Sequence, residues 1–442
     1  MEALSREALI LFNLSLALAA GLVLSRLAKK VGLPAVTAYL IAGILVGPYV
    51  IGAIGVEGLG FTSMENVESY GIVCDVALGF IAFLIGNEFR VSSLRKIGKQ
   101  ATVIGIVQAV FTTIVVDVGL IGLHFILGDK FPLPAAIVLG AVASATAPAA
   151  TLMVVKQYKA KGPVTDILLP VVALDDAVGL VLFAISFGVA RSIGAGRIDV
   201  VSVILEPLIE VVLSLVLGFV MGLLFTYMER FFHSRSKRLA VSVTFVFLTV
   251  AISMLKFDIG GVHVAFSSLL SCMMLGTVFC NICDFSEELM DRIDRWVAPI
   301  FVLFFVLSGA ELELSVFANG FIVLIGVVYI ATRSLGKCFG ASLSARSVKC
   351  DQNIVKYLGI TLLPQAGVAL GMAIQASAPG VLPNGVGDMV RNIVLFSVLV
   401  YEIVGPVLTK IALTRAGDIK PHEKVSAREI AKAAMEASVD KK

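Results

Sequence analysis

The chain has 442 residues, of which 58% are hydrophobic and only 15% are charged, and its net charge is +3. Soluble domains contain about 25% charged residues, so this composition excludes an ordinary soluble protein. The basic residues form short clusters between apolar stretches, a pattern typical of membrane orientation and not of nucleic-acid binding. We therefore expect a multi-pass membrane protein whose surroundings are the lipid bilayer, with no nucleic-acid partner.

The apolar stretches predict thirteen membrane-spanning helices, because one span needs about 20 mostly apolar residues. None of the stretches shows the alternating pattern of a barrel strand, and the first is too long for a typical signal peptide. The predicted fold is therefore an all-α membrane protein. In chain order, the spans cover residues 8–27, 33–51, 70–89, 101–127, 133–155, 164–190, 206–229, 239–256, 262–282, 296–314, 318–343, 355–378 and 390–413.

The distribution of basic residues predicts the orientation in the membrane. Arg90–Lys99 and Lys156–Lys161 follow odd-numbered spans, whereas Val50–Ser69, after the second span, carries only acidic charges. By the positive-inside rule, the N-terminus lies outside and the C-terminus in the cytoplasm. We expect a protein of the cell (inner) membrane with residues 415–442 as a short cytoplasmic tail.

A short Gly-x-Glu-x-x-x-Ser pattern occurs twice in the chain. The first copy ends the third span on the basic side, and the second ends the tenth span on the acidic side. One signature at opposite faces indicates an inverted-topology repeat, with spans 1–6 and 8–13 as its halves and span 7 between them. The two copies consist of Gly86, Glu88 and Ser92, and of Gly309, Glu311 and Ser315.

Prolines interrupt the fifth and twelfth spans, which occupy matching places in the two halves. The first interruption contains Ser144, Thr146 and Pro148, and the second contains Pro364 and Gln365. A proline removes a helical hydrogen bond and leaves carbonyl oxygens that can bind a cation. Ordinary proline kinks are the alternative. We expect two broken helices that cross near the bilayer midplane around an ion site.

Asp175 and Asp176 lie in the middle of the sixth span. One carboxylate at mid-membrane costs about 2.5–3.5 kcal/mol, and two adjacent carboxylates resist simultaneous ionisation. A cation and proton site explains this cost, because such a carboxylate can exchange H⁺ for a monovalent cation. Neighbouring helical residues point about 100° apart. One aspartate is therefore expected to face an aqueous cavity and the other a protein partner.

The eleventh span offers two basic partners for these aspartates, Arg333 and Lys337, which lie one helical turn apart. Snorkelling toward the inner surface is the alternative for Lys337. Asp117 and Glu402 are further mid-span carboxylates, which either line the pathway or satisfy backbone groups at a helix break. The Cys280–Cys283 pair lacks further ligands for zinc, and no cofactor is expected beyond the transported ions.

In this order, the motifs resemble the monovalent cation:proton antiporter superfamily, in its branch with paired aspartates, from residue 8 to about residue 414. Many relatives have an acidic residue where this chain has Ala147, and Arg-Gly-Glu where it has Gln365–Gly367, which leaves the choice of cation open. The resemblance rests on Gly32–Pro34, Tyr39–Pro48, Phe83–Glu88, Ser144–Ala149, Leu174–Asp176, and Arg333 with Gly336–Lys337.

The resemblance implies a homodimer in which a core moves against a scaffold. Residues 1–99 and 239–315 would form the scaffold and dimerisation helices, residues 192–238 the linker helix, and residues 100–191 and 316–414 the core. It also implies that Asp176 is the main cation and proton carrier and binds the monovalent metal ion, with Asp175 and Thr146 as further cation- and proton-binding residues. Asp175 would be the partner of the span-eleven base, with Lys337 as the first candidate.

The predicted function is a secondary antiporter that exchanges Na⁺, or else Li⁺ or K⁺, for H⁺ by alternating access. A sodium-coupled solute symporter of similar build is an alternative, whereas a channel would need a filter-like stretch, which is absent from the sequence. Gly385–Asp388 matches the Gly-x-Gly-Asp pattern of an intramembrane aspartyl protease, but we expect it in a loop before the last span. No enzymatic activity is expected.

Overall fold

A computed structural model describes residues 6–420, except residues 57, 196–199, 256, 260–261, 265, 313, 378–381 and 383–384. The described residues form sixteen α-helices, four short 3₁₀ helices and one two-stranded sheet. The α-helices are α1 (Arg6–Lys30), α2 (Ala35–Val46), α3 (Met64–Glu68), α4 (Gly71–Gly86), α5 (Val91–Leu127), α6 (Leu133–Val142), α7 (Pro148–Gln157), α8 (Pro163–Ala195), α9 (Val200–Glu229), α10 (Arg235–Ser253), α11 (Ser268–Ile282), α12 (Ser286–Ala310), α13 (Gly320–Ser347), α14 (Gln352–Thr361), α15 (Gly367–Ser377) and α16 (Val386–Ala416). The 3₁₀ helices are η1 (Gly52–Ile54), η2 (Asn87–Phe89), η3 (Gly128–Lys130) and η4 (Leu314–Ala318).

Each predicted span contains at least one of these helices, and the prediction of a helical membrane protein is confirmed. Within the described ranges, eight helices are long and apolar enough to cross a membrane. Five shorter apolar segments, at 35–46, 71–86, 133–142, 268–282 and 368–377, have 10–17 residues each. A helix of this length is too short to cross the bilayer alone, so each would need neighbouring segments to complete a span. The count of thirteen spans therefore stays a prediction.

Two of the sequence predictions are wrong. The ninth span was expected to begin at residue 262, but Val262–Val264 forms strand β2, which pairs antiparallel with β1 (Phe257–Ile259), and α11 begins only at Ser268. In this pairing, Ile259 lies opposite Val262. Asp388 was expected in a loop before the last span, but it lies in the first turn of α16.

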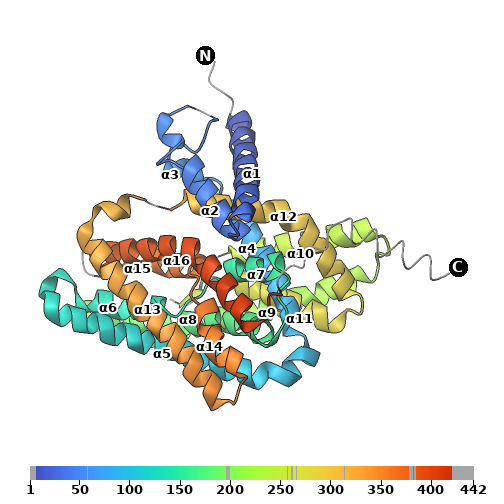
Figure 1. The fold of residues 1–442 in the computed structure, drawn as a ribbon. Helices are drawn as coiled ribbons and strands as arrows, with labels where there is room; N and C mark the ends of the chain where they lie inside the picture. Colours follow the sequence, from blue (N-terminus) through green and yellow to red (C-terminus); the bar gives the residue numbers. More distant parts are fainter. Residues whose placement is uncertain are drawn as a thin grey trace.

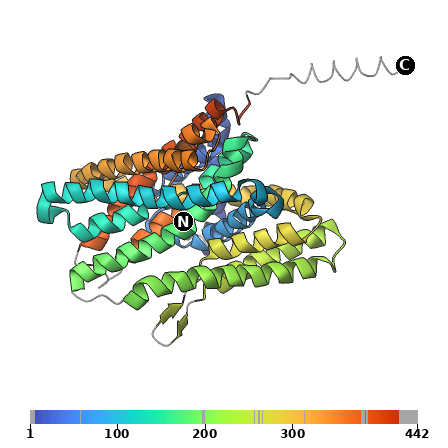
Figure 2. The ribbon, with the colours of Figure 1, turned by 90° about the horizontal axis from the view of Figure 1, so that it is seen from below.

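The helices pack in two groups (Figures 1 and 2). The scaffold group comprises α1, α2, α4, α9, α10, α11 and α12, and the core group comprises α5, α6, α8, α13, α14, α15 and α16; both names here describe packing only. Figure 2 shows α5 and α13 side by side in the core group, and the β1–β2 hairpin projecting from the helices. Helix α7 lies between the groups, in contact with α8 and α16 on one side and with α2 and α4 on the other.

Glycines bring two pairs of scaffold helices into close contact. At the crossing of α2 and α12, a Cβ atom on Gly43 or Gly309 would lie 2.0 or 2.2 Å from a carbonyl oxygen of the facing helix. At the crossing of α4 and α11, a Cβ on Gly86 or Gly276 would lie 2.3 or 2.1 Å from the facing carbonyl. These distances are too short for any side chain, so both crossings depend on glycine.

Candidate ion-binding site

Both predicted helix interruptions are present, and they are hydrogen-bonded to each other. Helix α6 ends at Val142 and α7 begins at Pro148, while α14 ends at Thr361 and α15 begins at residue 367. Ala147, which precedes a proline, has extended backbone angles (φ −83°, ψ 103°), as a residue in that position prefers. Its N–H donates to the carbonyl oxygen of Pro364 at 2.8 Å. The two interrupted segments therefore meet inside the bundle.

Arg333, on α13, binds carbonyl oxygens that the two breaks release, and its side chain is completely buried. Its Nε donates to Ala143 O at 2.9 Å and its Nη2 to Ala145 O at 2.7 Å. Its Nη1 donates to Leu363 O at 2.7 Å, and the guanidinium lies 4.5 Å from the ring centre of Tyr401. A planar group with several fixed donors suits this task. Arg333 thus holds the two breaks together and does not contact Asp175.

Gln365 is a second buried link between the breaks. Its Nε2 donates to Val142 O and to the hydroxyl of Tyr329, both at 3.0 Å. Its Oε1 accepts a hydrogen bond from Ser397 Oγ of α16 at 3.0 Å. Both the nitrogen and the oxygen of its amide group are therefore hydrogen-bonded to protein groups, and these bonds connect the end of α6 with α13 and α16. Neither Tyr329 nor Ser397 was singled out from the sequence.

Lys337, Asp175 and Thr146 form a buried cluster beside the first break. Lys337 Nζ lies 2.6 Å from Asp175 Oδ2, 2.9 Å from Thr146 Oγ1 and 2.5 Å from the carbonyl oxygen of Ser144. Thr146 Oγ1 also donates to Asp175 Oδ2 at 2.5 Å. Since Lys337 and Asp175 are both completely buried, the pair lies out of reach of bulk water. Of the two basic residues considered from the sequence, Lys337 is therefore the one that contacts Asp175.

The sequence interpretation missed Gln108, whose Nε2 donates to Asp175 Oδ1 from α5. Gln108 is completely buried. Its polar amide in the otherwise apolar fourth span is the sequence feature that could have identified it as a site residue. The side chain of Ser144 donates to Ala141 O at 2.7 Å, so this residue reaches the cluster only through its carbonyl. Asp117 lies elsewhere, against Gly140 of α6, where an added Cβ would meet its carboxylate.

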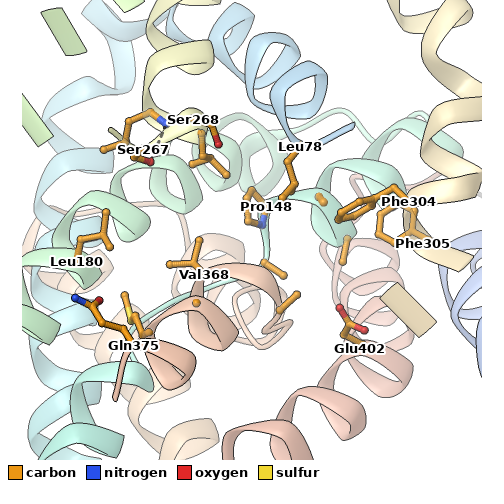
Figure 3. A pocket seen from close by; sticks show the side chains of 18 of the residues that line it. Leu78, Pro148, Leu180, Ser267, Ser268, Phe304, Phe305, Val368, Gln375 and Glu402 are labelled. Carbon is orange, nitrogen blue, oxygen red and sulfur yellow. Dashed lines mark hydrogen bonds between the residues drawn. The ribbon is translucent and has the colours of Figure 1, made fainter. Parts of the chain in front are cut away.

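A cavity of about 330 Å³ lies between the two breaks and the scaffold helices (Figure 3). Its core-side wall includes Pro148, Leu180 and Val368, and its scaffold-side wall includes Leu40, Leu78, Phe304 and Phe305. Its polar lining residues among the described ones are Glu210, Ser267, Ser268, Gln375 and Glu402. The lining is thus mostly apolar and carries a few acidic and neutral polar groups, which is typical of a site for a small ligand.

The side chain of Asp176 lies outside the described residues. Its backbone belongs to α8, four residues before Leu180, which lines the cavity. Residues four apart lie on the same face of a helix. Among the described residues, no group of three or more His, Cys, Asp and Glu side chains could hold a metal ion, so the Cys280–Cys283 pair gains no further ligand there.

The other end of the interface between the groups is held by polar contacts. Lys156, at the end of α7, forms a salt bridge with Asp294 of α12. Gln157 Oε1 accepts a hydrogen bond from the N–H of Ala35, at the start of α2, at 2.7 Å. Phe304 of α12 lines the cavity. Asp294 precedes it by ten residues, which corresponds to about 15 Å along the helix axis at 1.5 Å per residue. Helix α7, which lies between the groups, is therefore joined to the scaffold helices α2 and α12 at the end that carries Lys156, while the cavity lies toward the opposite end.

Comparisons with known proteins agree with this architecture. The sodium/hydrogen exchanger, transmembrane family matches residues 14–415. The chain is 25% identical to the K(+)/H(+) antiporter subunit KhtU of Bacillus subtilis, over 91% of this chain and 93% of the relative. It is 24% identical to the Na(+)/H(+) antiporter NhaS4 of Synechocystis, over 78% of this chain and 86% of the relative.

A solved structure of the sodium proton antiporter MjNhaP1 from Methanocaldococcus jannaschii superposes with a TM-score of 0.71 at 18% identity, covering 92% of this chain and 98% of that chain. The structure determined for that protein at pH 8 gives a TM-score of 0.65, also at 18% identity. This likeness shows the fold. The family match extends over nearly the whole chain, which confirms the resemblance seen in its motifs: the chain belongs to the sodium/hydrogen exchanger family.

Proposed function

We propose that this protein exchanges Na⁺ for H⁺ across the cell membrane by alternating access, with Asp176 as the main carrier of both ions. One observation carries the proposal: a buried Lys337–Asp175–Thr146 cluster lies where two interrupted helices meet, next to a cavity between two packing groups. Asp176 adjoins this cluster in the chain and shares a helix face with the cavity-lining Leu180. Mid-membrane carboxylates of this kind are typical of ion pathways.

The charges of the cluster suggest how ions are exchanged. With the carrier protonated, Asp175 and Lys337 neutralise each other, and the buried site holds no net charge. When Na⁺ enters the cavity, Asp176 gives up its proton and binds the cation. Where the bound cation also takes Asp175 as a ligand, it displaces the Lys337 ammonium group, and the separated Lys337 releases a second proton to water. Turnover would then move net charge.

The glycine contacts support an inverted repeat. In such a repeat, the second span corresponds to the ninth and the third to the tenth. The α2–α12 crossing at Gly43 and Gly309 would thus correspond to the α11–α4 crossing at Gly276 and Gly86. Each crossing joins a helix of one half to a helix of the other half through two glycines. An inverted repeat predicts this similarity, because its symmetry relates the two crossings to each other.

The closed and open ends support an assignment of the conformation. By the positive-inside rule, the end with Lys156 faces the cytoplasm, and there the Lys156–Asp294 bridge joins α7 to the scaffold group. The cavity reaches Ser267, directly before the start of α11, and Glu210 in the first half of α9. The structure would then be outward-facing, with the N-terminus outside. The core group would move against the scaffold group, through which two copies would form a homodimer.

K⁺/H⁺ exchange is the second candidate, because the relatives differ in the cation that their names give: K⁺ for the Bacillus subtilis protein and Na⁺ for the Synechocystis protein. A symporter gains no support, since the family is one of exchangers. The neutral Ala147 and Gln365 lie at the two breaks, so acidic cation ligands must come from other positions. The site geometry is compatible with either ion.

Transport in proteoliposomes tests the proposal. An imposed pH gradient with Na⁺, K⁺ or Li⁺ offered singly identifies the cation. Asp176→Asn should remove exchange without preventing insertion, because an amide cannot alternate between a proton and a cation. Asp166→Asn is a matched control, since Asp166 is an exposed aspartate of the same helix. Exchange by Asp176→Asn at the control rate would show that another residue carries the ions.

A further inference from the structure

Glu402 is a buried carboxylate on the wall of the cavity. Its side chain lies on α16 and is 7% exposed. Its Oε2 is buried and has no hydrogen-bond partner. Figure 3 shows the carboxyl group on the cavity side of α16, not far from Phe305. Hydrogen bonding within the protein therefore leaves this group incompletely satisfied, and it is directed toward a space that a small ion can enter.

No basic side chain neutralises Glu402 among the described residues. The buried bases of the neighbouring α13 are already engaged, Arg333 with carbonyls of the breaks and Lys337 with Asp175. The adjacent helices α2, α6 and α15 contain no charged residue, and Lys156 of α7 is paired with Asp294.

The other carboxylates around Glu402 offer it no compensating charge. Glu311 follows the end of α12, and Glu210 of α9 lines the same cavity. On α8, Asp175 is neutralised by Lys337. A buried carboxylate without a counter-ion is unfavourable when ionised. Glu402 is therefore stable either as the neutral acid or beside a bound cation.

Glu402 also lies beside the second break. Gly405, about one turn further along α16, packs against Pro364, to which an added Cβ would approach within 3.0 Å. Ala366, two residues after this proline, lines the same cavity as Glu402. A cation that enters the cavity and approaches the breaks would therefore come close to this carboxylate.

We propose that Glu402 is a second exchange site of the cavity, which holds a proton when no cation is present and releases it when a monovalent cation binds beside its carboxylate. In this step the O–H bond of the neutral acid breaks, the proton leaves to water, and the cation takes its place, so total charge is conserved. The chemical class of the cation rests on the proposed antiport function. Glu402 would hold the incoming cation on the cavity wall beside the second break, before the cation reaches α8.

Cation-induced proton release separates this site from the main carrier. Purified full-length protein in weakly buffered detergent solution, with a pH dye, receives NaCl or KCl, with choline chloride as the salt control. In an Asp176→Asn background, adding the cation should still release protons, and the additional change Glu402→Gln should reduce that release by one proton per protein. Glu402→Asp in the same background should restore it, because the carboxylate is retained.

Glu229→Gln is the matched control. Glu229 is a completely buried carboxylate, but it has Arg238 as a basic neighbour at 3.8 Å and lies at the far end of α9 from Glu210. Its replacement in the Asp176→Asn background should leave proton release unchanged. Equal release from the Glu402→Gln and Glu229→Gln variants, both folded by size-exclusion chromatography, would overturn the proposal. Failure of the antiport proposal would appear differently, as Asp176→Asn protein that still exchanges ions in proteoliposomes.

Discussion

The replacement Lys337→Gln provides a direct test of the buried cluster. It removes an ammonium group that donates to Asp175, Thr146 and the carbonyl of Ser144. Because the side chains of the Lys337–Asp175 pair are both completely buried, the change leaves an uncompensated carboxylate. Breaking a buried pair in this way costs about 3–5 kcal/mol. We expect a clear fall in the thermal unfolding midpoint of the purified protein.

A double-mutant cycle distinguishes pairing from packing. Asp175→Asn alone should also destabilise the protein, because it leaves Lys337 charged and buried. The double variant removes both charges and should lose less stability than the sum of the two single variants, with a coupling energy between about 0.5 and 3 kcal/mol. Additive effects within about 0.5 kcal/mol would show that the contact of 2.6 Å contributes no pairwise energy.

The same replacement tests whether Lys337 makes turnover electrogenic. Moving one charge through 100 mV changes the free energy by about 2.3 kcal/mol, which corresponds to about a fiftyfold change in the equilibrium ion gradient, at 1.36 kcal/mol per tenfold. Wild-type proteoliposomes should respond to potassium–valinomycin potentials on this scale, while Lys337→Gln should exchange ions with almost no voltage response. An equal voltage response from both proteins would refute the proposed proton release from Lys337.

Further substitutions test the packing and the contact at the Lys156 end. Arg333→Lys retains the charge but loses the planar fork, so at least one buried carbonyl should lose its partner and the unfolding free energy should fall by about 1–3 kcal/mol, measured by thermal unfolding. Gly309→Ala should destabilise the protein, because its Cβ would lie 2.2 Å from a backbone oxygen, whereas Gly122→Ala, with nothing within 4 Å, should be neutral or stabilising in the same assay. Asp294→Asn breaks a half-exposed salt bridge with Lys156, so it should shift the balance between the two conformations by no more than about fivefold, since such pairs contribute about 0–1 kcal/mol. The measurement is labelling, by a thiol reagent, of a cysteine introduced on the cavity wall by Ser268→Cys, and a larger change in that labelling would contradict the prediction.

The amino-acid sequence by itself predicted the membrane class, a helix in each apolar stretch and the two interruptions. These features depend on local physics. An apolar stretch of this length favours a helix in the bilayer because its backbone must be hydrogen-bonded within the segment. Pro148 and Pro364 interrupt their helices because a proline lacks an N–H and restricts the preceding residue. The local patterns failed at the β1–β2 hairpin, where an apolar stretch rich in β-branched residues was interpreted as the start of a helix.

Only the tertiary structure decided which base contacts Asp175. Arg333 and Lys337 share one face of α13, so their spacing could not distinguish them, and Asp175 is 162 residues away in the chain from Lys337. The structure directs Arg333 to the carbonyls of the breaks and leaves Lys337 for the carboxylate. It also brings Gln108 to Asp175 from a third helix. Such contacts depend on how helices cross and rotate against one another, and these are determined by packing across the bundle, which the helical period of one segment does not specify.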